Sequence, residues 1–249
     1  MIRTSSNLYR QFSSNLLQRT YVFKNAQPPT KKFSHFARSY AKMPDKVTLS
    51  GIGSDTDPSV VKQYDRDTPK EQQCKDFFAI ADGLKLCLMI TERANIGPVS
   101  RAMAVAKREG PDFLFLANVN SQKFKDIKGS DTINLSFIDT KSTDWISVSG
   151  KATTRLNKED PRIEKLYTPA VKAWFGDLGD GVHDGSAKDP RVGLIEVHSK
   201  YVAYYKTETG TIGHAKEIAG AVLTGSVAQT GLLRELSEED LAMARKWEK

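Results

Sequence analysis

The stretch that decides the fold is residues 113–129, FLFLANVNSQKFKDIKG. Five apolar residues lead into the polar segment NVNSQK, which passes directly into a short helical pattern. Short apolar runs bounded by turn residues are typical of strands in small antiparallel sheets and barrels. We therefore expect a strand over Phe113–Asn118, followed at once by a short helix over Ser121–Lys128.

Similar short runs recur on both sides of this stretch. Further strands are expected over Leu84–Thr91, Pro98–Ala106, Thr132–Asp139, Trp145–Thr154, Val192–His198 and Val202–Lys206, with a tight turn at Ser199 and Lys200. Helical patterns cover residues 69–82, residues 159–175 with a break at Pro169, and the tail after residue 210. Many short strands with few long helices predict a mainly β fold with α elements, namely a small antiparallel barrel decorated by helices.

The positive charge of the chain is concentrated at its N-terminus. Of 37 basic residues, seven lie in residues 1–40, where no acidic residue occurs. Subtracting those seven leaves 30 basic residues against 30 acidic ones, so the rest of the chain is formally neutral. No basic patch interleaved with aromatic residues remains, and we expect no nucleic-acid partner.

Residues 1–40 are also rich in serine, which is typical of an organelle transit peptide. We expect a mitochondrial matrix protein that is cleaved after Tyr40, because Arg38 in RSY then lies at the third position before the cut, as in mitochondrial processing sites. The alternatives are an untargeted disordered tail and a cytoplasmic form that begins at Met43. The expected division is a transit peptide over 1–40, a disordered linker over 41–68, the barrel over 69–210 and a helical extension over 211–249.

Several kinds of site are not expected. Cys74 and Cys87 do not indicate a disulfide framework, and Cys87 lies in an apolar run. His183, His198 and His214 are far apart without cysteine or carboxylate partners at ligand spacing, so no metal site is predicted. No apolar run approaches the length of a membrane span.

The helix start after residue 118 has the chemistry of an anion site. Ser121 can offer a hydroxyl there and Lys123 a full charge, beside free N–H groups at the positive end of the helix dipole. Arg101, in the expected strand GPVSRAMAV, can add a bidentate contact if the strands converge. The alternatives are an ordinary serine cap with a solvated lysine, and an arginine on a surface strand.

The order of segments resembles a known family. SRAMAV, FLFLANVNSQKFKDI, WISVSGKA, YTPAVKAWFGD and GLIEVHSKYVAYY follow one another between about residues 70 and 235. This order resembles the pyridoxamine 5'-phosphate oxidase-like, FMN-binding split-barrel family, and is similar to its general stress protein branch and its fungal blue-light-inducible members. The resemblance implies a six- to seven-stranded antiparallel split β-barrel, a homodimer, and FMN whose phosphate is held by Arg101, Ser121 and Lys123.

The resemblance also implies positions around the flavin ring. The backbone from Ser100 to Val105, including Met103, is expected to run along the isoalloxazine. Trp145 resembles a position that faces the flavin across the dimer interface, and Trp174 is expected to cover the ring. For both tryptophans the alternative is core packing, which the apolar stripe favours for Trp174.

The vitamin-processing members carry a late Arg-x-His pair that has no counterpart near VHSKYVAYYK, so pyridoxamine phosphate oxidation is not expected. The resemblance implies an FMN-dependent oxidoreductase of unknown substrate in a stress or redox response. The alternatives are a non-catalytic flavin-binding, stress-related protein, and a mitochondrial interaction module that uses the helical tail. No catalytic residue is assigned, and Tyr201, Tyr204 and Tyr205 are candidates by analogy only.

Overall fold

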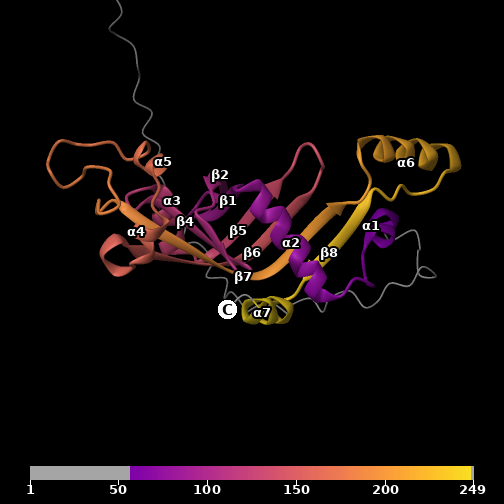
Figure 1. Ribbon diagram of the computed structural model, residues 1–249, viewed down its shortest axis with the longest axis horizontal. Coiled ribbons are helices and arrows are strands. Elements are labelled where there is room, and N and C mark those ends of the chain that lie inside the picture. The colour runs from indigo at the N-terminus through magenta and orange to yellow at the C-terminus, as the bar shows by residue number, and fades with distance from the viewer. Residues whose placement is uncertain (1–56, 248–249) are drawn as a thin grey trace, which may run out of the picture. The chain divides into compact units, whose positions relative to one another are not determined.

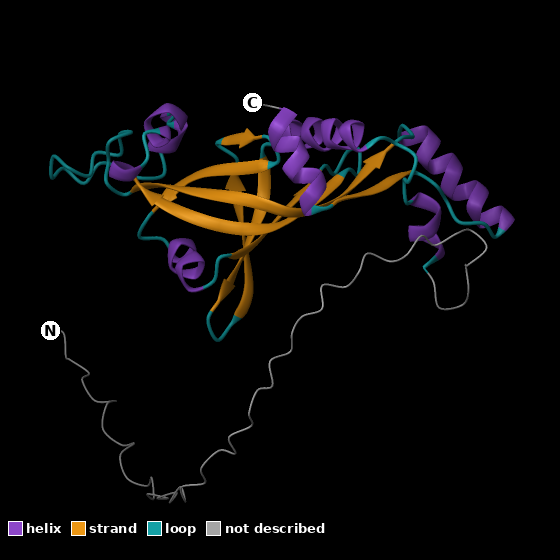
Figure 2. Cartoon of the chain, turned by 90° about the horizontal axis from the view of Figure 1, so that it is seen from below, coloured by secondary structure: helices purple, strands orange, loops and turns teal. Residues whose placement is uncertain are grey.

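The computed structural model describes residues 57–247, in which eight strands form one antiparallel sheet flanked by helices (Figures 1 and 2). The strands are β1 (Leu86–Arg93), β2 (Gly97–Ala104), β3 (Lys107–Glu109), β4 (Asp112–Asn118), β5 (Thr132–Ile138), β6 (Trp145–Leu156), β7 (Val192–Thr207) and β8 (Gly231–Leu236). The helices are α1 (Pro58–Gln63), α2 (Lys70–Leu84), α3 (Gln122–Gly129), α4 (Arg162–Leu166), α5 (Pro169–Lys172), α6 (Thr211–Thr224) and α7 (Glu238–Trp247), with a 3₁₀ turn, η2, at Asn157–Glu159.

The strands close into a ring through a two-residue junction. Their order is β2-β1-β5-β6-β7-β4-β3, and only Val105 and Ala106 separate the two ends, β2 and β3, along the chain. The Val105 N–H donates to Lys85 O beside β1, and the Ala106 N–H donates to Leu114 O in β4. The chain thus passes from pairing with β1 to pairing with β4, and the predicted antiparallel barrel is confirmed. The expected count of six to seven strands omitted β3 and β8.

The barrel interior is filled by the alternating residues of its strands. In β5, Ile133, Leu135 and Phe137 are buried while the residues between them face outward. The rings of Phe113 and Phe137 meet with centroids 5.4 Å apart. Helix α2 packs on β5, β6 and β8 (Figure 1). It adds Phe77 to the core, where this residue is fully buried. The helix expected over residues 69–82 is therefore confirmed, and it supplies part of the core.

The expected turn at Ser199 and Lys200 is wrong, because β7 runs unbroken for 16 residues. One edge of β7 pairs with β6 throughout, while the other pairs first with β4 and then with β8. The two polar residues mark this change of partner, where Ser199 Oγ donates to Pro111 O at 2.6 Å. Strand β6 has a bulge at Gly150, opposite the same part of β7. Glycine is required there, because a Cβ would lie 2.3 Å from the His198 carbonyl oxygen.

The C-terminal segment is not a separate helical extension. Between α6 and α7 the chain forms β8, which pairs with β7, and α7 buries Leu241 and Ala244 completely. Part of the expected disordered linker is also ordered, because residues 58–63 form α1 and the Asp65 N–H donates to Leu233 O at 2.9 Å. Arg234 of β8 is almost fully buried and pairs with Asp65 at 2.6 Å. The segments before α2 and after α6 are therefore held together on the barrel.

The expected break at Pro169 is confirmed, since α4 ends at Leu166 and α5 begins at the proline. These helices cover a second, smaller core that includes Ile163 and Leu194. The transit peptide expected over residues 1–40 and most of the expected linker lie outside the described residues. Within the described part, no helix is long and apolar enough to span a membrane.

Candidate functional site

Helix α3 begins at the end of β4 because the polar residues between them form a tight turn. The Asn118 side chain accepts the Asn120 N–H at 2.9 Å, and the Val119 N–H donates to Arg191 O at 2.9 Å. The strand pairing thus ends in a local side-chain turn, and α3 then packs on β1 and β6. The helix predicted directly after the strand is confirmed.

Gly193 in β7 lets α3 lie close to the sheet. A Cβ at this position would lie 2.5 Å from Val119 Cγ1 and 2.8 Å from Phe124 Cζ. Real Cβ atoms do not approach other atoms so closely, so any larger residue would push α3 outward. The absence of a side chain at one sheet position therefore fixes the position of the helix.

Ser121 is the N-cap of α3, yet its hydroxyl caps nothing. The side chain makes no capping hydrogen bond, and Oγ is the single buried side-chain polar atom of the described residues that has no partner. An orphaned buried hydroxyl costs free energy, on the order of 1–3 kcal/mol. Such a group at the positive end of a helix has the arrangement of an anion-binding donor.

Lys123 lies two residues further along α3 and is half-buried. Burial and, to a smaller extent, the neighbouring Arg101 guanidinium lower the pKa of Lys123 below its ordinary value. Its ammonium has no hydrogen bond or ion pair to any residue in the part of the chain that the structure describes. Lys123 therefore lies near a second cation, Arg101, and two residues after Ser121 in the chain.

Arg101 is fixed by a carboxylate that sequence reasoning missed. Asp126, on α3, is 1% exposed and accepts a hydrogen bond from Arg101 Nη2 at 3.1 Å. Arg93 makes a two-pronged contact with it through Nε at 3.2 Å and Nη2 at 3.1 Å. Thr91 Oγ1 donates to it at 2.9 Å and accepts from Arg101 Nη1 at 2.6 Å. The donor set is completed by Gln122 Nε2 at 3.1 Å.

The site carries a surplus of positive charge. Burial alone raises the pKa of Asp126, but hydrogen bonds from Arg93, Gln122 and Thr91 outweigh burial and lower the pKa to about 2. Asp126 is therefore ionised at neutral pH. Arg93 and Arg101 pair with this carboxylate, and Lys123 lies near Arg101, so three cations and one carboxylate give a formal charge of +2. A phosphate monoester carries about −1.5 to −2 near pH 7 and matches this surplus.

The other residues expected near the ring lie along β2 and β6. Ser100 is exposed and Met103 is half-buried against the core, as expected for alternating residues of one strand. Trp145 is half-buried at the first position of β6. Its partner across the ladder, Ile138 of β5, is 64% exposed. On the next strand, β1, Leu88 is also exposed and lies opposite Ser136 of β5. Trp145 thus borders an open apolar area on the outer face of the sheet.

Trp174 is 86% exposed, so the core packing favoured by its apolar stripe is wrong. The chain leaves the helical path after α5 ends at Lys172, and Phe175 takes the buried position instead. Periodicity across Pro169 therefore placed the wrong aromatic residue in the core.

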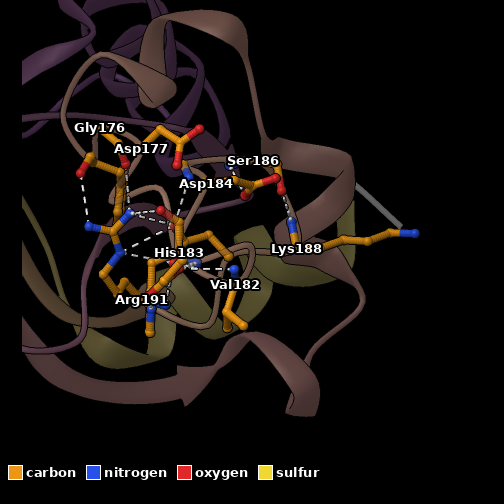
Figure 3. A network of polar contacts seen from close by, with 12 residues as sticks. Gly176, Asp177, Val182, His183, Asp184, Ser186, Lys188 and Arg191 are labelled. Atoms are coloured by element: carbon orange, nitrogen blue, oxygen red, sulfur yellow. Dashed lines mark hydrogen bonds and ion pairs between the residues drawn. The ribbon is translucent and has the colours of Figure 1, made fainter.

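The loop after Trp174 is held together by one arginine (Figure 3). Arg191 donates through Nη1 to Phe175 O at 2.9 Å and through Nη2 to Gly176 O at 2.7 Å. It also pairs with the fully buried carboxylate of Asp189 at 2.7 Å. Among the described residues no cluster of potential metal ligands occurs, in this loop or elsewhere.

The tyrosines named by analogy do not gather at α3. Tyr204 is fully buried, and its hydroxyl donates to Gln73 O in α2 at 2.6 Å. The Tyr205 hydroxyl meets Thr230 Oγ1 at 2.6 Å, and Tyr201 interacts with Glu235. All three phenols are directed to α2 or to the neighbourhood of β8.

A sequence signal for Asp126 did exist. An acidic residue flanked by Phe124 and Ile127 on the packed side of a short helix must find cationic partners. The candidates Arg93 and Arg101 lie in two earlier strands, β1 and β2, but nothing in their spacing shows that strand register brings both to one carboxylate.

Comparison with known proteins gives a consistent result. The family described as pyridoxamine 5'-phosphate oxidase like matches residues 72–229. Protein bli-3 of Neurospora crassa is 38% identical over 188 residues, covering 74% of this chain and 89% of that protein. A solved structure from Jannaschia sp. CCS1, named after general stress protein 26, aligns with a TM-score of 0.53 and 15% identity, covering 67% of this chain and 99% of the other. General Stress Protein 26 from Bacillus anthracis str. Sterne aligns with a TM-score of 0.45 and 22% identity over 53% and 93% of the two chains.

Proposed function

Because this chain belongs to the pyridoxamine 5'-phosphate oxidase-like family, we propose that it binds FMN through the phosphate at the start of α3 and acts as a flavin-dependent oxidoreductase. The observation that carries the proposal is the buried, unpartnered Ser121 hydroxyl beside Lys123. A phosphate oxygen would satisfy the hydroxyl, and its charge would offset the surplus of +2.

The residues of the site divide into three roles. Ser121 and Lys123 donate to the phosphate from α3, and Arg101 adds guanidinium N–H groups from β2. The backbone from Ser100 to Val105, in β2 and just after it, supports the ring, with Trp145 near it. FMN, when bound, supplies hydride-transfer chemistry, and the protein supplies binding, orientation and electrostatics.

A second candidate function is non-catalytic flavin binding in a stress response. It is favoured by the tyrosines, because the hydroxyls of Tyr204 and Tyr205 are already engaged and are not available as acids or bases. Mixing the FMN-loaded protein with NADPH or NADH under anaerobic conditions separates the two. Bleaching of the flavin absorption supports the oxidoreductase, and its absence with both donors supports the non-catalytic role.

The phosphate contact is tested by Lys123→Ala. Loss of a charge-assisted contact is expected to weaken FMN binding roughly tenfold to a hundredfold, while riboflavin, which has no phosphate, binds as before. Fluorescence titration with both flavins measures this. Lys125→Ala is the matched control, because that lysine is exposed on the same helix. Equal losses for FMN and riboflavin would exclude a contact between Lys123 and the phosphate.

We also propose that the chain is a homodimer formed through the outer face of β1 and β5. Leu88 and Ile138 leave apolar surface exposed on the face that carries Trp145. A second copy of the chain would cover this surface, with the flavin at the interface. Ile138→Asp should therefore convert the dimer to a monomer in light scattering at micromolar concentration. A native protein that is monomeric with flavin bound would contradict the proposal.

For residues 1–40 we propose removal after Tyr40 in mitochondria. Seven positive charges without a negative one support import along the inside-negative membrane potential, at about 2.3 kcal/mol per charge per 100 mV. N-terminal sequencing of the protein from its native cell should then begin near Ala41. A start at Met43 in cytosolic protein would instead support internal initiation.

A further inference from the structure

The Asp126 carboxylate is unusual for an anion-binding site, because it places a buried negative charge among the cations. On charge alone, a carboxylate beside a phosphate weakens binding through like-charge repulsion. Its own hydrogen bonds indicate a different role. Both oxygens are occupied, by Arg93 and Gln122 at Oδ1 and by Arg93, Arg101 and Thr91 at Oδ2.

These contacts restrict the Arg101 guanidinium to one orientation. Its Nη2 is held by Asp126, and its Nη1 is held by Thr91, whose hydroxyl in turn donates to Asp126. The Arg101 side chain is 20% exposed, whereas Asp126 is 1% exposed, so the carboxylate lies behind the guanidinium. A guanidinium has five N–H groups in a rigid fork. Nη1 also donates to Met89 O at 3.5 Å. The Nε–H and the second Nη2–H remain for a ligand.

We propose that Asp126 is a positioning residue that orients Arg101 toward the anion held by Ser121 and Lys123. The proposal rests on the proposed phosphate site. Asp126 does not touch the ligand itself, and its benefit comes from a pre-oriented guanidinium that loses little rotational freedom on binding. Arg93, which takes part in the two-pronged contact, offsets the negative charge that this arrangement introduces.

The proposal makes a prediction of opposite sign to simple electrostatics. Asp126→Asn raises the formal charge of the site from +2 to +3, so Coulomb attraction alone predicts tighter binding of a dianion. Loss of orientation predicts weaker FMN binding, by about tenfold or more, because an amide offers one acceptor oxygen for the five donor contacts that the two carboxylate oxygens now accept, and it carries no charge. Riboflavin binding should not change. Fluorescence titration of both flavins gives the result, and unchanged or tighter FMN binding overturns the proposal.

Two controls separate orientation from general effects. Asp131→Asn makes the same change in charge at an exposed residue that is paired with Lys151 at 2.6 Å, and it should leave FMN affinity unchanged. If Asp126→Asn does not fold, the double variant Arg93→Gln/Asp126→Asn removes both members of the pair and restores the charge of +2. Removal of a whole buried pair is far better tolerated than removal of one partner. This variant should also bind FMN about tenfold more weakly, and native affinity would overturn the proposal.

Inorganic phosphate distinguishes failure of this proposal from failure of the flavin proposal. Phosphate should raise the melting temperature of the native protein, and should raise that of Asp126→Asn less. If phosphate but not FMN raises the melting temperature of the native protein, the proposed flavin function is wrong. The positioning role of Asp126 is then tested by the response of Asp126→Asn to phosphate alone. An equal or larger rise in the variant overturns the positioning role, and no response of the native protein to either ligand overturns both proposals.

Discussion

Ser121 and Ser237 show how the same residue at the start of a helix can serve two ends. Ser237, directly before α7, exchanges hydrogen bonds with Asp240, its Oγ accepting the Asp240 N–H at 3.2 Å. Ser121 directly precedes α3 and makes no such bond, although its Oγ is buried. One hydroxyl stabilises its own helix, and the other is kept unsatisfied at a cost to stability.

Replacement of Ser121 by alanine should therefore stabilise the flavin-free protein and weaken ligand binding. Removing an unsatisfied buried hydroxyl is expected to raise the free energy of unfolding by up to about 1 kcal/mol, since no capping bond is lost. FMN binding should fall by roughly twofold to tenfold, the contribution of one hydrogen bond. Urea unfolding and FMN titration measure the two effects.

Ser237→Ala provides the contrast, with an expected loss of about 1 kcal/mol in stability because a cap is removed. Its FMN affinity should match that of the native protein. If both serine variants lost stability alike, the Ser121 hydroxyl would have to be satisfied within the protein, and the anion site would lose its main support.

At the level of elements, the site depends on how closely α3 approaches β7. Val119 and Phe124 pack over Gly193, while Asp126 reaches back to β1 and β2 from the same helix. Because Ser121 caps the short helix that carries Asp126, any shift of α3 moves the proposed phosphate donors and the residue proposed to orient Arg101. The sheet position at Gly193 therefore influences a site that it does not touch.

Gly193→Ala should be destabilising and should weaken FMN binding together. The new Cβ would lie 2.5 Å from Val119 and 2.8 Å from Phe124, so α3 must move, at about 1–3 kcal/mol for overpacking. Chemical denaturation and FMN titration are the measurements.

Gly83→Ala is the matched control, because no atom lies within 4 Å of a Cβ built there in α2. Alanine in a helix is favoured over glycine by roughly 0.5–1 kcal/mol, so this variant should be as stable as the native protein or more so. A Gly193→Ala protein with native stability and affinity would show that α3 accommodates the methyl group without moving.

Across the whole molecule, three buried carboxylates hold arginine side chains in place. Asp126 holds α3 to β1 and β2, Asp189 holds Arg191 inside the loop after α5, and Asp65 accepts from Arg234 of β8. The side chains of all three carboxylates are at most 6% exposed. Hydrogen bonds lower the pKa of each carboxyl group to about 2. For Asp189 the hydrogen bond from Arg191 is the largest cause. For Asp126 and Asp65 burial raises the pKa, but the hydrogen bonds outweigh it.

These shifts predict acid unfolding between about pH 4 and pH 2. A carboxylate with a depressed folded-state pKa contributes stability that is complete above its unfolded pKa, near 4, and is lost as pH falls through its folded pKa. A shift of nearly two pKa units corresponds to about 2 kcal/mol for each group. The free energy of unfolding, measured with urea at several pH values, should therefore fall steeply over this range.

Asp189→Asn tests the contribution of one group. The variant should be less stable than the native protein at pH 7, and the two stability curves should converge toward pH 2, where the native carboxylate is also becoming protonated. Curves that stay parallel from pH 7 to pH 2 would contradict the assignment, because the lost stability would then not depend on ionisation of Asp189.

The sequence by itself determined the features that depend on neighbouring residues. The short strands, the break at Pro169 and the helix after Asn118 follow from local spacing, proline geometry and turn chemistry. The resemblance identified the family correctly, and Ser121 and Lys123 could be predicted as a pair because both lie on one short segment. Local periodicity failed for Trp174, where it was carried across the proline into a non-helical segment.

Only the tertiary structure decided which distant residues meet. Asp126 lies 25 residues from Arg101 and 33 from Arg93, and the register of β1, β2 and α3 brings them together. The closure through Val105 and Ala106, and the addition of β8 to β7, likewise require pairing across the chain. Local patterns fix which face of an element is apolar. They do not fix which partner that face will meet, because the free energy of a buried ion pair or a strand ladder exists only once the fold has formed.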